Sequence, residues 1–165
     1  MVSGCRCFCS GGLGEAEAVR RLAFFCLVTA LATASCVGPI RDFQGYRAKA
    51  WHGVETASSA VEATIFGVRD ALRNQAFAPY LSVSIRDAEE DASTAQSQFA
   101  SIQPPDAASD KLRATVSSVL ADASDTVSRA RIAMRRGDIG TMGELEQALD
   151  HVAKRLDQMS ARLQP

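Results

Sequence analysis

The sequence predicts an all-α protein, an antiparallel up-down-up-down four-helix bundle that follows an apolar N-terminal segment. Apolar residues recur at helical spacing from residue 43 almost to residue 165. Turn or breaker residues interrupt this pattern at three places. The connections between the four expected helices are short, which favours antiparallel neighbours.

The first predicted helix runs from Phe43 to Phe77 and ends before Pro79, which cannot donate a backbone hydrogen bond. Its apolar residues are Val54, Val61 and Val68, which are seven residues apart, with Trp51, Ile65 and Leu72 on the adjacent flank. The second helix ends at residues 103–106, which include two prolines. Its stripe comprises Leu81, Ile85, Ala88, Ala92, Ala95, Phe99 and Ile102.

The third helix is predicted to end at two basic residues, Arg135 and Arg136, followed by Gly137 as the C-cap. Its stripe comprises Leu112, Val116, Val119, Ala123, Val127, Ala130 and Met134. The fourth helix begins at Asp138 or at Thr141, because Thr141 and Glu144 match a capping box. Its stripe, the most regular, comprises Met142, Leu145, Leu149, Val152, Leu156, Met159 and Leu163.

Ion pairs are expected across the first and third connections if each pair of helices folds back on itself. The candidates are Arg69 and Arg73 with Asp87, and Arg129 and Arg131 with Glu144 and Glu146. Exposed pairs of this kind contribute under about 1 kcal/mol each, so they would bias the register more than they stabilise the fold.

Composition indicates one domain with little net charge. The chain has 165 residues, 47% of them hydrophobic and 22% charged. Residues 1–35 hold three arginines and two glutamates, so the rest carries 15 positive and 17 negative side chains. A nucleic-acid partner is not expected, because binding one requires a basic face. Fifteen arginines against three lysines indicate a GC-rich genome, such as that of an actinobacterium.

The segment 19–35 has the order of a signal peptide. Arg20 and Arg21 form a basic start, residues 22–31 are apolar, and residues 32–35 are small. Residues 1–18 fit poorly in front of it, since they contain acidic side chains and a glycine-rich stretch. We therefore expect translation to begin at Val19 and residues 1–18 to be an upstream extension.

Residues Thr33-Ala34-Ser35-Cys36 resemble the lipobox of bacterial lipoproteins, although Thr33 stands where the family usually has leucine. The resemblance implies that the Cys36 thiol takes a diglyceride and that Cys36 becomes the new N-terminus. Residues 36–42 would then form a lipidated end and a short linker, and residues 43–165 a helical domain held by acyl chains on the extracytoplasmic side of the cell membrane.

Two other interpretations of this segment remain open. Residues 32–34 also match an A-x-A site for ordinary secretion, and residues 22–40 are long enough to stay as a membrane anchor. All three interpretations place the helical domain outside the cytoplasm.

No catalytic, metal or cofactor site is expected. A di-metal site in a bundle needs Glu-x-x-His, but Lys49 stands three residues before His52 and Ala148 three before His151. The chain has no G-x-S-x-G nucleophile elbow and no phosphate-binding glycine loop.

The first and third connections would lie at the end of the bundle away from Cys36. Phe77, Tyr80, Arg135 and Arg136 gather there, an aromatic and arginine mixture that is common at interfaces. The two aromatic residues could instead plug the end of the bundle. The leading hypothesis is a non-enzymatic envelope lipoprotein that binds or spaces another envelope protein. The alternative is a ligand-binding or sensory bundle with a pocket between helices near Trp51.

Overall fold

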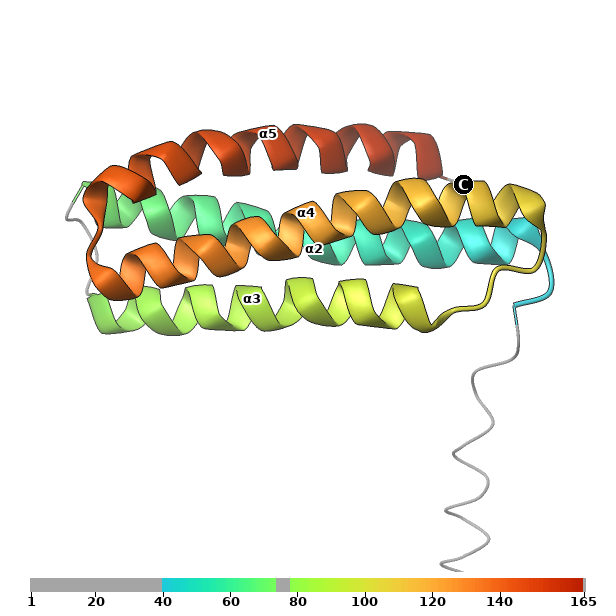
Figure 1. Ribbon diagram of the computed structural model, residues 1–165, viewed down its shortest axis with the longest axis horizontal. Coiled ribbons are helices and arrows are strands. Elements are labelled where there is room, and N and C mark those ends of the chain that lie inside the picture. The colour runs from blue at the N-terminus through green and yellow to red at the C-terminus, as the bar shows by residue number, and fades with distance from the viewer. Residues whose placement is uncertain (1–39, 74–77, 165) are drawn as a thin grey trace, which may run out of the picture. The chain divides into compact units, whose positions relative to one another are not determined.

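The computed structural model describes residues 40–73 and 78–164, which form four α-helices and no strand (Figure 1). The helices are α2 (Phe43–Leu72), α3 (Ala78–Ser101), α4 (Ala107–Arg136) and α5 (Ile139–Leu163). The all-α fold class predicted from the sequence is confirmed. Within these two described stretches, no helix is both long and apolar enough to cross a membrane.

Each helix runs back along the one before it (Figure 1). Helices α2 and α5 close the bundle, since Arg47 near the start of α2 contacts Arg162 near the end of α5. At the other end, Arg69 of α2 contacts Glu146 of α5. Helices α2 and α4 also pack across one diagonal, whereas no Cα atom in the described part of α3 lies within 8 Å of one in α5.

The apolar stripes predicted from the sequence form the core. All seven stripe residues of α5 are buried, and so are most of those in the other helices. The partly buried exceptions are Trp51, Leu72, Ile102, Leu112 and Met134, which pack against the core from its edges. Ile40, expected in the linker, also packs against the core. The seven-residue spacing therefore identified the inner face of each helix correctly.

Aspartates begin three of the helices by accepting a hydrogen bond from a backbone N–H of the first turn. The pairs are Asp42 with Gly45 at 2.7 Å, Asp106 with Ser109 at 2.8 Å and Asp138 with Thr141 at 3.1 Å. Of the two predicted starts for α5, the structure therefore selects Asp138. Gly137 ends α4 in the left-handed conformation with φ 64°, as predicted.

The first helix is shorter than predicted. It ends at Leu72 instead of Phe77, and the backbone N–H of Arg73 closes its last turn on the carbonyl of Arg69 at 3.1 Å. Asn74, which follows in the sequence, is a residue type that favours helix ends because its side chain competes for backbone hydrogen bonds. Phe77 lies outside the described residues.

The predicted ion pairs across the connections are wrong. Arg69 pairs with Glu146 at 2.7 Å and with Asp150 at 3.1 Å, both on α5, instead of with Asp87 on α3. Arg131 pairs with Glu89 on α3 instead of with the acidic residues of α5. Each helix has two neighbours on its flanks, and sequence spacing alone does not say which neighbour a given flank faces.

Candidate functional site

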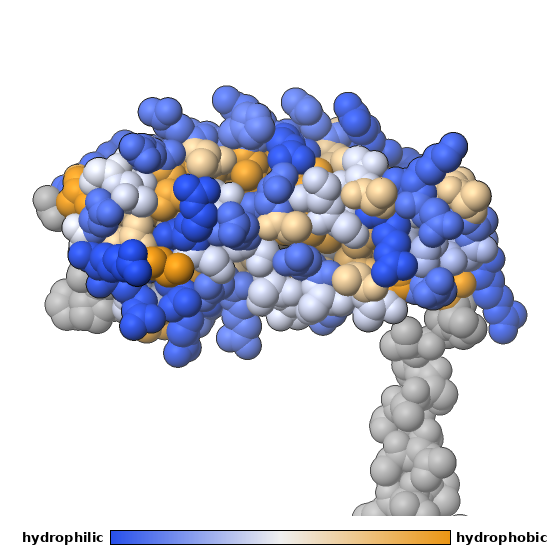
Figure 2. Space-filling model, viewed as in Figure 1, coloured by the Kyte–Doolittle hydropathy of each residue, from blue (hydrophilic) through white to orange (hydrophobic). Residues whose placement is uncertain are grey.

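Large apolar side chains are exposed at one end of the bundle. In the part of the chain that the structure describes, the exposed large hydrophobic residues are Phe66, Tyr80, Val83, Ile132 and Ile139. They lie near the C-terminal ends of α2 and α4 or the N-terminal ends of α3 and α5, which meet at one end (Figure 1). Figure 2 shows apolar groups on this end beside strongly hydrophilic ones.

We call this end the distal tip, because it lies opposite Ile40, and define it by these five residues with Arg135 and Arg136. Helix α2 spans about 45 Å between the two ends of the bundle at 1.5 Å per residue. Exposed apolar side chains are common on any surface when scattered singly, and the presence of five of them toward one end makes this end the candidate binding surface.

Two arginines of the tip lie in the last turn of α4, where positive charge is favourable next to the helix C-terminus. Both arginines, together with Ile132, line a shallow hollow of about 310 Å³. Arg135 makes no hydrogen bond or ion pair with any described residue. Arg136 helps to keep the pKa of Asp138 below its usual range, although hydrogen bonds from Thr141 are the larger cause.

A second hollow of about 290 Å³ lies between α3 and α4 and shares Arg135 with the first. Its other lining residues are Ser82, Val83, Arg86 and Arg131. Glu89 holds Arg131 in place by pairing with its Nε atom, and Ser128 donates a hydrogen bond of 2.6 Å to the same carboxylate. Arginine and apolar side chains therefore line the two hollows on the α3–α4 side of the tip together.

The structure places the residues predicted for this surface as follows. Tyr80 is 67% exposed on the first turn of α3, so its side chain does not plug the bundle end. Arg135 and Arg136 are exposed and adjacent. Tyr80 lines neither of the two hollows that contain Arg135. Phe77 and Cys36 lie outside the described residues.

Sequence reasoning missed the residues that connect the arginines into one surface. Val83 and Ile132 each lie between two core positions of their helix, so they face away from the core. Large β-branched residues at such positions are a detectable signal, because a solvent-facing position more often carries a polar side chain. Arg86 and Arg131 gave no comparable signal, since charged residues are expected on outer faces.

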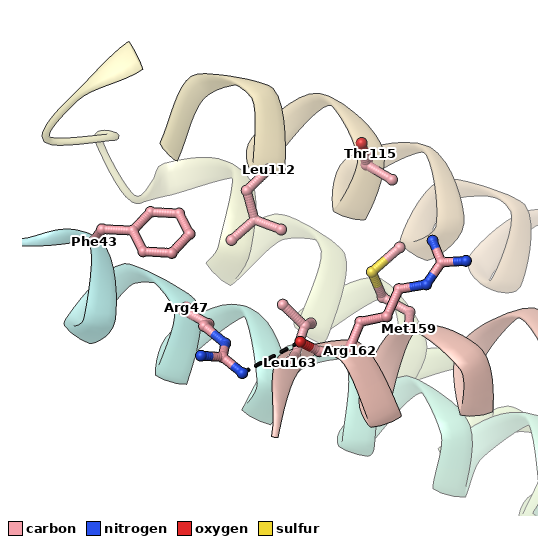
Figure 3. A pocket seen from close by; sticks show the side chains of 7 residues that line it. All are labelled: Phe43, Arg47, Leu112, Thr115, Met159, Arg162 and Leu163. Atoms are coloured by element: carbon pink, nitrogen blue, oxygen red, sulfur yellow. Dashed lines mark hydrogen bonds between the residues drawn. The ribbon is translucent and has the colours of Figure 1, made fainter. Parts of the chain in front are cut away.

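A larger pocket of about 500 Å³ lies at the opposite end of the bundle (Figure 3). It opens between the start of α2, the start of α4 and the end of α5. We call it the proximal pocket. It is lined by Phe43, Arg47, Leu112, Thr115, Met159, Arg162 and Leu163.

The residues considered for ligand or metal binding are Trp51 and the two histidines. Trp51 is half-buried, and its Nε1 atom donates a hydrogen bond of 3.2 Å to Ser160. His52 and His151 are exposed, and the ring of His52 lies 4.9 Å from that of Trp51. No three His, Cys, Asp or Glu side chains of the described residues gather as a metal site would require.

Comparison with known proteins gives no relative: no family model matches the chain, and no curated protein or solved structure is significantly similar to it.

Proposed function

We propose that the protein is a non-enzymatic lipoprotein of the cell envelope whose helical bundle docks on another envelope protein through the distal tip. The observation that carries this proposal is the gathering of exposed apolar side chains at one end of the bundle, next to Arg135 and Arg136.

The tether in this proposal rests on the sequence Thr33-Ala34-Ser35-Cys36. Three residues lie between Cys36 and Ile40, so the four residue-to-residue steps span at most about 14 Å of chain. A lipid on Cys36 would therefore hold the Ile40 end of the bundle near the bilayer. The opposite end, which carries the distal tip, would be free to reach a partner.

The chemistry of the tip favours a partner surface that combines acidic and apolar side chains. Burying one large apolar side chain stabilises a complex by about 1.5–3 kcal/mol, and arginine is enriched among interface residues that dominate binding. Arg135 has no acidic partner within the described residues. Carboxylates of the docked protein would pair with Arg135 and would fix the orientation of that protein on the tip.

Site-specific photo-crosslinking in cells that export the protein tests the tip. A photoreactive residue at Ile132 should form one discrete crosslinked product, whereas the same residue at exposed Asp157 should not. Arg135→Glu with Arg136→Glu should abolish the product, and Lys111→Glu with Lys154→Glu, an equal charge reversal elsewhere, should retain it. Equal crosslinking at both positions, or a product that survives the arginine reversal, would overturn the proposed docking surface.

Mass spectrometry of the mature N-terminus tests the tether separately. We expect Cys36 as the first residue, carrying acyl chains, and release of the Cys36→Ser variant from the membrane fraction. A mature chain that begins at another residue, or an unmodified Cys36, would overturn the tether and leave the tip to be judged on the crosslinking result.

A further inference from the structure

The proximal pocket exists because one helix is shorter than its neighbours at this end. Helix α5 ends at Leu163, while the first turns of α2 and α4 extend past that point (Figure 1). The facing side chains of Phe43 and Leu112 are therefore only half-buried. A volume of about 500 Å³ lies within the range of roughly 300–1,000 Å³ that is usual for pockets that bind small molecules.

Four of the seven described residues that line the proximal pocket are apolar. Phe43 of α2 and Leu112 of α4 lie toward one end of the opening, and Met159 of α5 lies toward the other (Figure 3). Leu163 lies between them. A row of branched aliphatic, aromatic and thioether groups suits a flexible hydrocarbon chain, since methionine adapts its shape to its neighbours.

Two arginines border this apolar row. Arg47 donates to the main-chain carbonyl of Arg162 at 3.3 Å and also to that of Gln164. It thereby satisfies carbonyls at the end of α5 and offsets the negative end of the helix dipole. The guanidinium of Arg162 lies at the mouth beside Met159 (Figure 3) and makes no hydrogen bond or ion pair with any described residue.

We infer that the proximal pocket binds an acyl chain of an anionic phospholipid, with its phosphate at Arg162. The apolar row would accept the hydrocarbon, and each buried CH₂ group favours binding. A guanidinium suits a phosphate because it can donate two parallel hydrogen bonds. Arg47 would add positive charge to the lining of the pocket.

The choice of a membrane phospholipid as the source of this ligand rests on the proposed tether. A pocket that lies a few residues of chain from a lipidated Cys36 would face a high local concentration of phospholipid. The binding chemistry itself, an acyl chain with a phosphate, rests on the pocket alone. Binding can therefore be measured on the full chain whether or not Cys36 is acylated.

Trp51 provides a local probe of the pocket. It is the only tryptophan of the chain, it lies one helical turn from Arg47, and it bonds to Ser160, the neighbour of Met159. A lysophosphatidylglycerol with bromine atoms on its acyl chain should quench the fluorescence of Trp51 in a saturable way. Because bromine quenches at contact range, lipid bound elsewhere on the chain would leave this signal unchanged.

The expected results separate the two parts of the site. Arg162→Gln should weaken lysophosphatidylglycerol binding about tenfold, since one charged donor to the phosphate is lost. Arg129→Gln, the same change at another exposed position, should have no effect. Leu112→Asn should weaken binding of every acyl ligand. Circular dichroism should show wild-type helicity in all three variants.

Two other ligands test whether the bound acyl chain belongs to an anionic phospholipid. A brominated fatty acid lacks the phosphate, and the choline cation of a brominated lysophosphatidylcholine would lie near the arginines of the pocket. Each should therefore quench about tenfold more weakly than lysophosphatidylglycerol. Equal quenching by the fatty acid would overturn the assignment to a phospholipid. A complete absence of quenching would overturn the pocket as a lipid site. Quenching by all three lipids would also overturn it if neither Arg162→Gln nor Leu112→Asn changed the signal. Neither result depends on the fate of Cys36.

Discussion

Tyr46 is fully buried in the core between α2 and its neighbours, with its ring 5.5 Å from that of Phe99. Its hydroxyl has no hydrogen-bond partner among the described residues. Burial raises the pKa of this hydroxyl above its usual value, and the charge of Arg113 opposes that effect only in part. The helical stripe predicted from the sequence did not include Tyr46, because tyrosine is as often exposed as buried.

Tyr46→Phe tests whether this hydroxyl destabilises the fold. An unsatisfied buried polar group costs about 1–3 kcal/mol, so removing it should leave the free energy of unfolding unchanged or raise it by up to about 2 kcal/mol. Urea denaturation measures the difference. Tyr80→Phe, at an exposed hydroxyl, should change nothing. A loss of more than about 1 kcal/mol in Tyr46→Phe would mean that the hydroxyl has a partner in solution.

At the scale of single helices, the aspartate caps couple stability to pH. A hydrogen bond from the backbone N–H of Ser109 lowers the pKa of Asp106, and hydrogen bonds from Thr141 lower that of Asp138. Both carboxylates are therefore more acidic in the folded chain than in the unfolded chain. Their contribution is complete above the unfolded pKa of about 3.9 and is lost as the pH falls through the lower folded values.

Asp106→Asn combined with Asp138→Asn should remove this dependence without removing the caps, because asparagine caps helices about as well as aspartate. The double variant should match the wild type in thermal stability at neutral pH. Below about pH 4 its stability should fall less steeply than that of the wild type. Identical slopes in thermal melts across this range would show that the two carboxylates do not contribute.

At the scale of the whole molecule, two glycines of α2 define how closely its neighbours approach. A Cβ atom at Gly53 would lie 3.8 Å from Leu120 of α4, an ordinary contact. At Gly67 it would lie 3.0 Å from Ile85 of α3, which is fully buried. A Cβ atom at Gly67 would therefore require the side chain of Ile85 to shift by a few tenths of an ångström.

The two glycine-to-alanine variants should differ in sign. Gly53→Ala should raise the free energy of unfolding by up to about 1 kcal/mol, since alanine loses less backbone entropy in a helix. Gly67→Ala should lower it by up to about 2 kcal/mol, because overpacking a core costs about 1–3 kcal/mol. Urea denaturation measures both changes in the free energy of unfolding, provided that its dependence on urea concentration is the same as in the wild type. Equal stabilisation by the two variants would contradict the close approach of α2 and α3.

The sequence by itself determined the helices and the face that each one buries. Apolar spacing located the core positions, and Gly137 and Asp138 located a boundary, because these signals depend on backbone conformation and burial within one helix. The surfaces are different, since they are assembled from several helices.

Only the tertiary structure decided which flanks of the helices meet. Arg69 pairs with Glu146 of α5 and not with α3. Val83 and Ile132 lie beside the arginines of the tip because α3 packs against α4. The proximal pocket likewise depends on where α5 ends beside α2 and α4. Spacing along one chain fixes the angle of a side chain around its own helix, but contacts between helices also depend on their order around the bundle and on their axial offset.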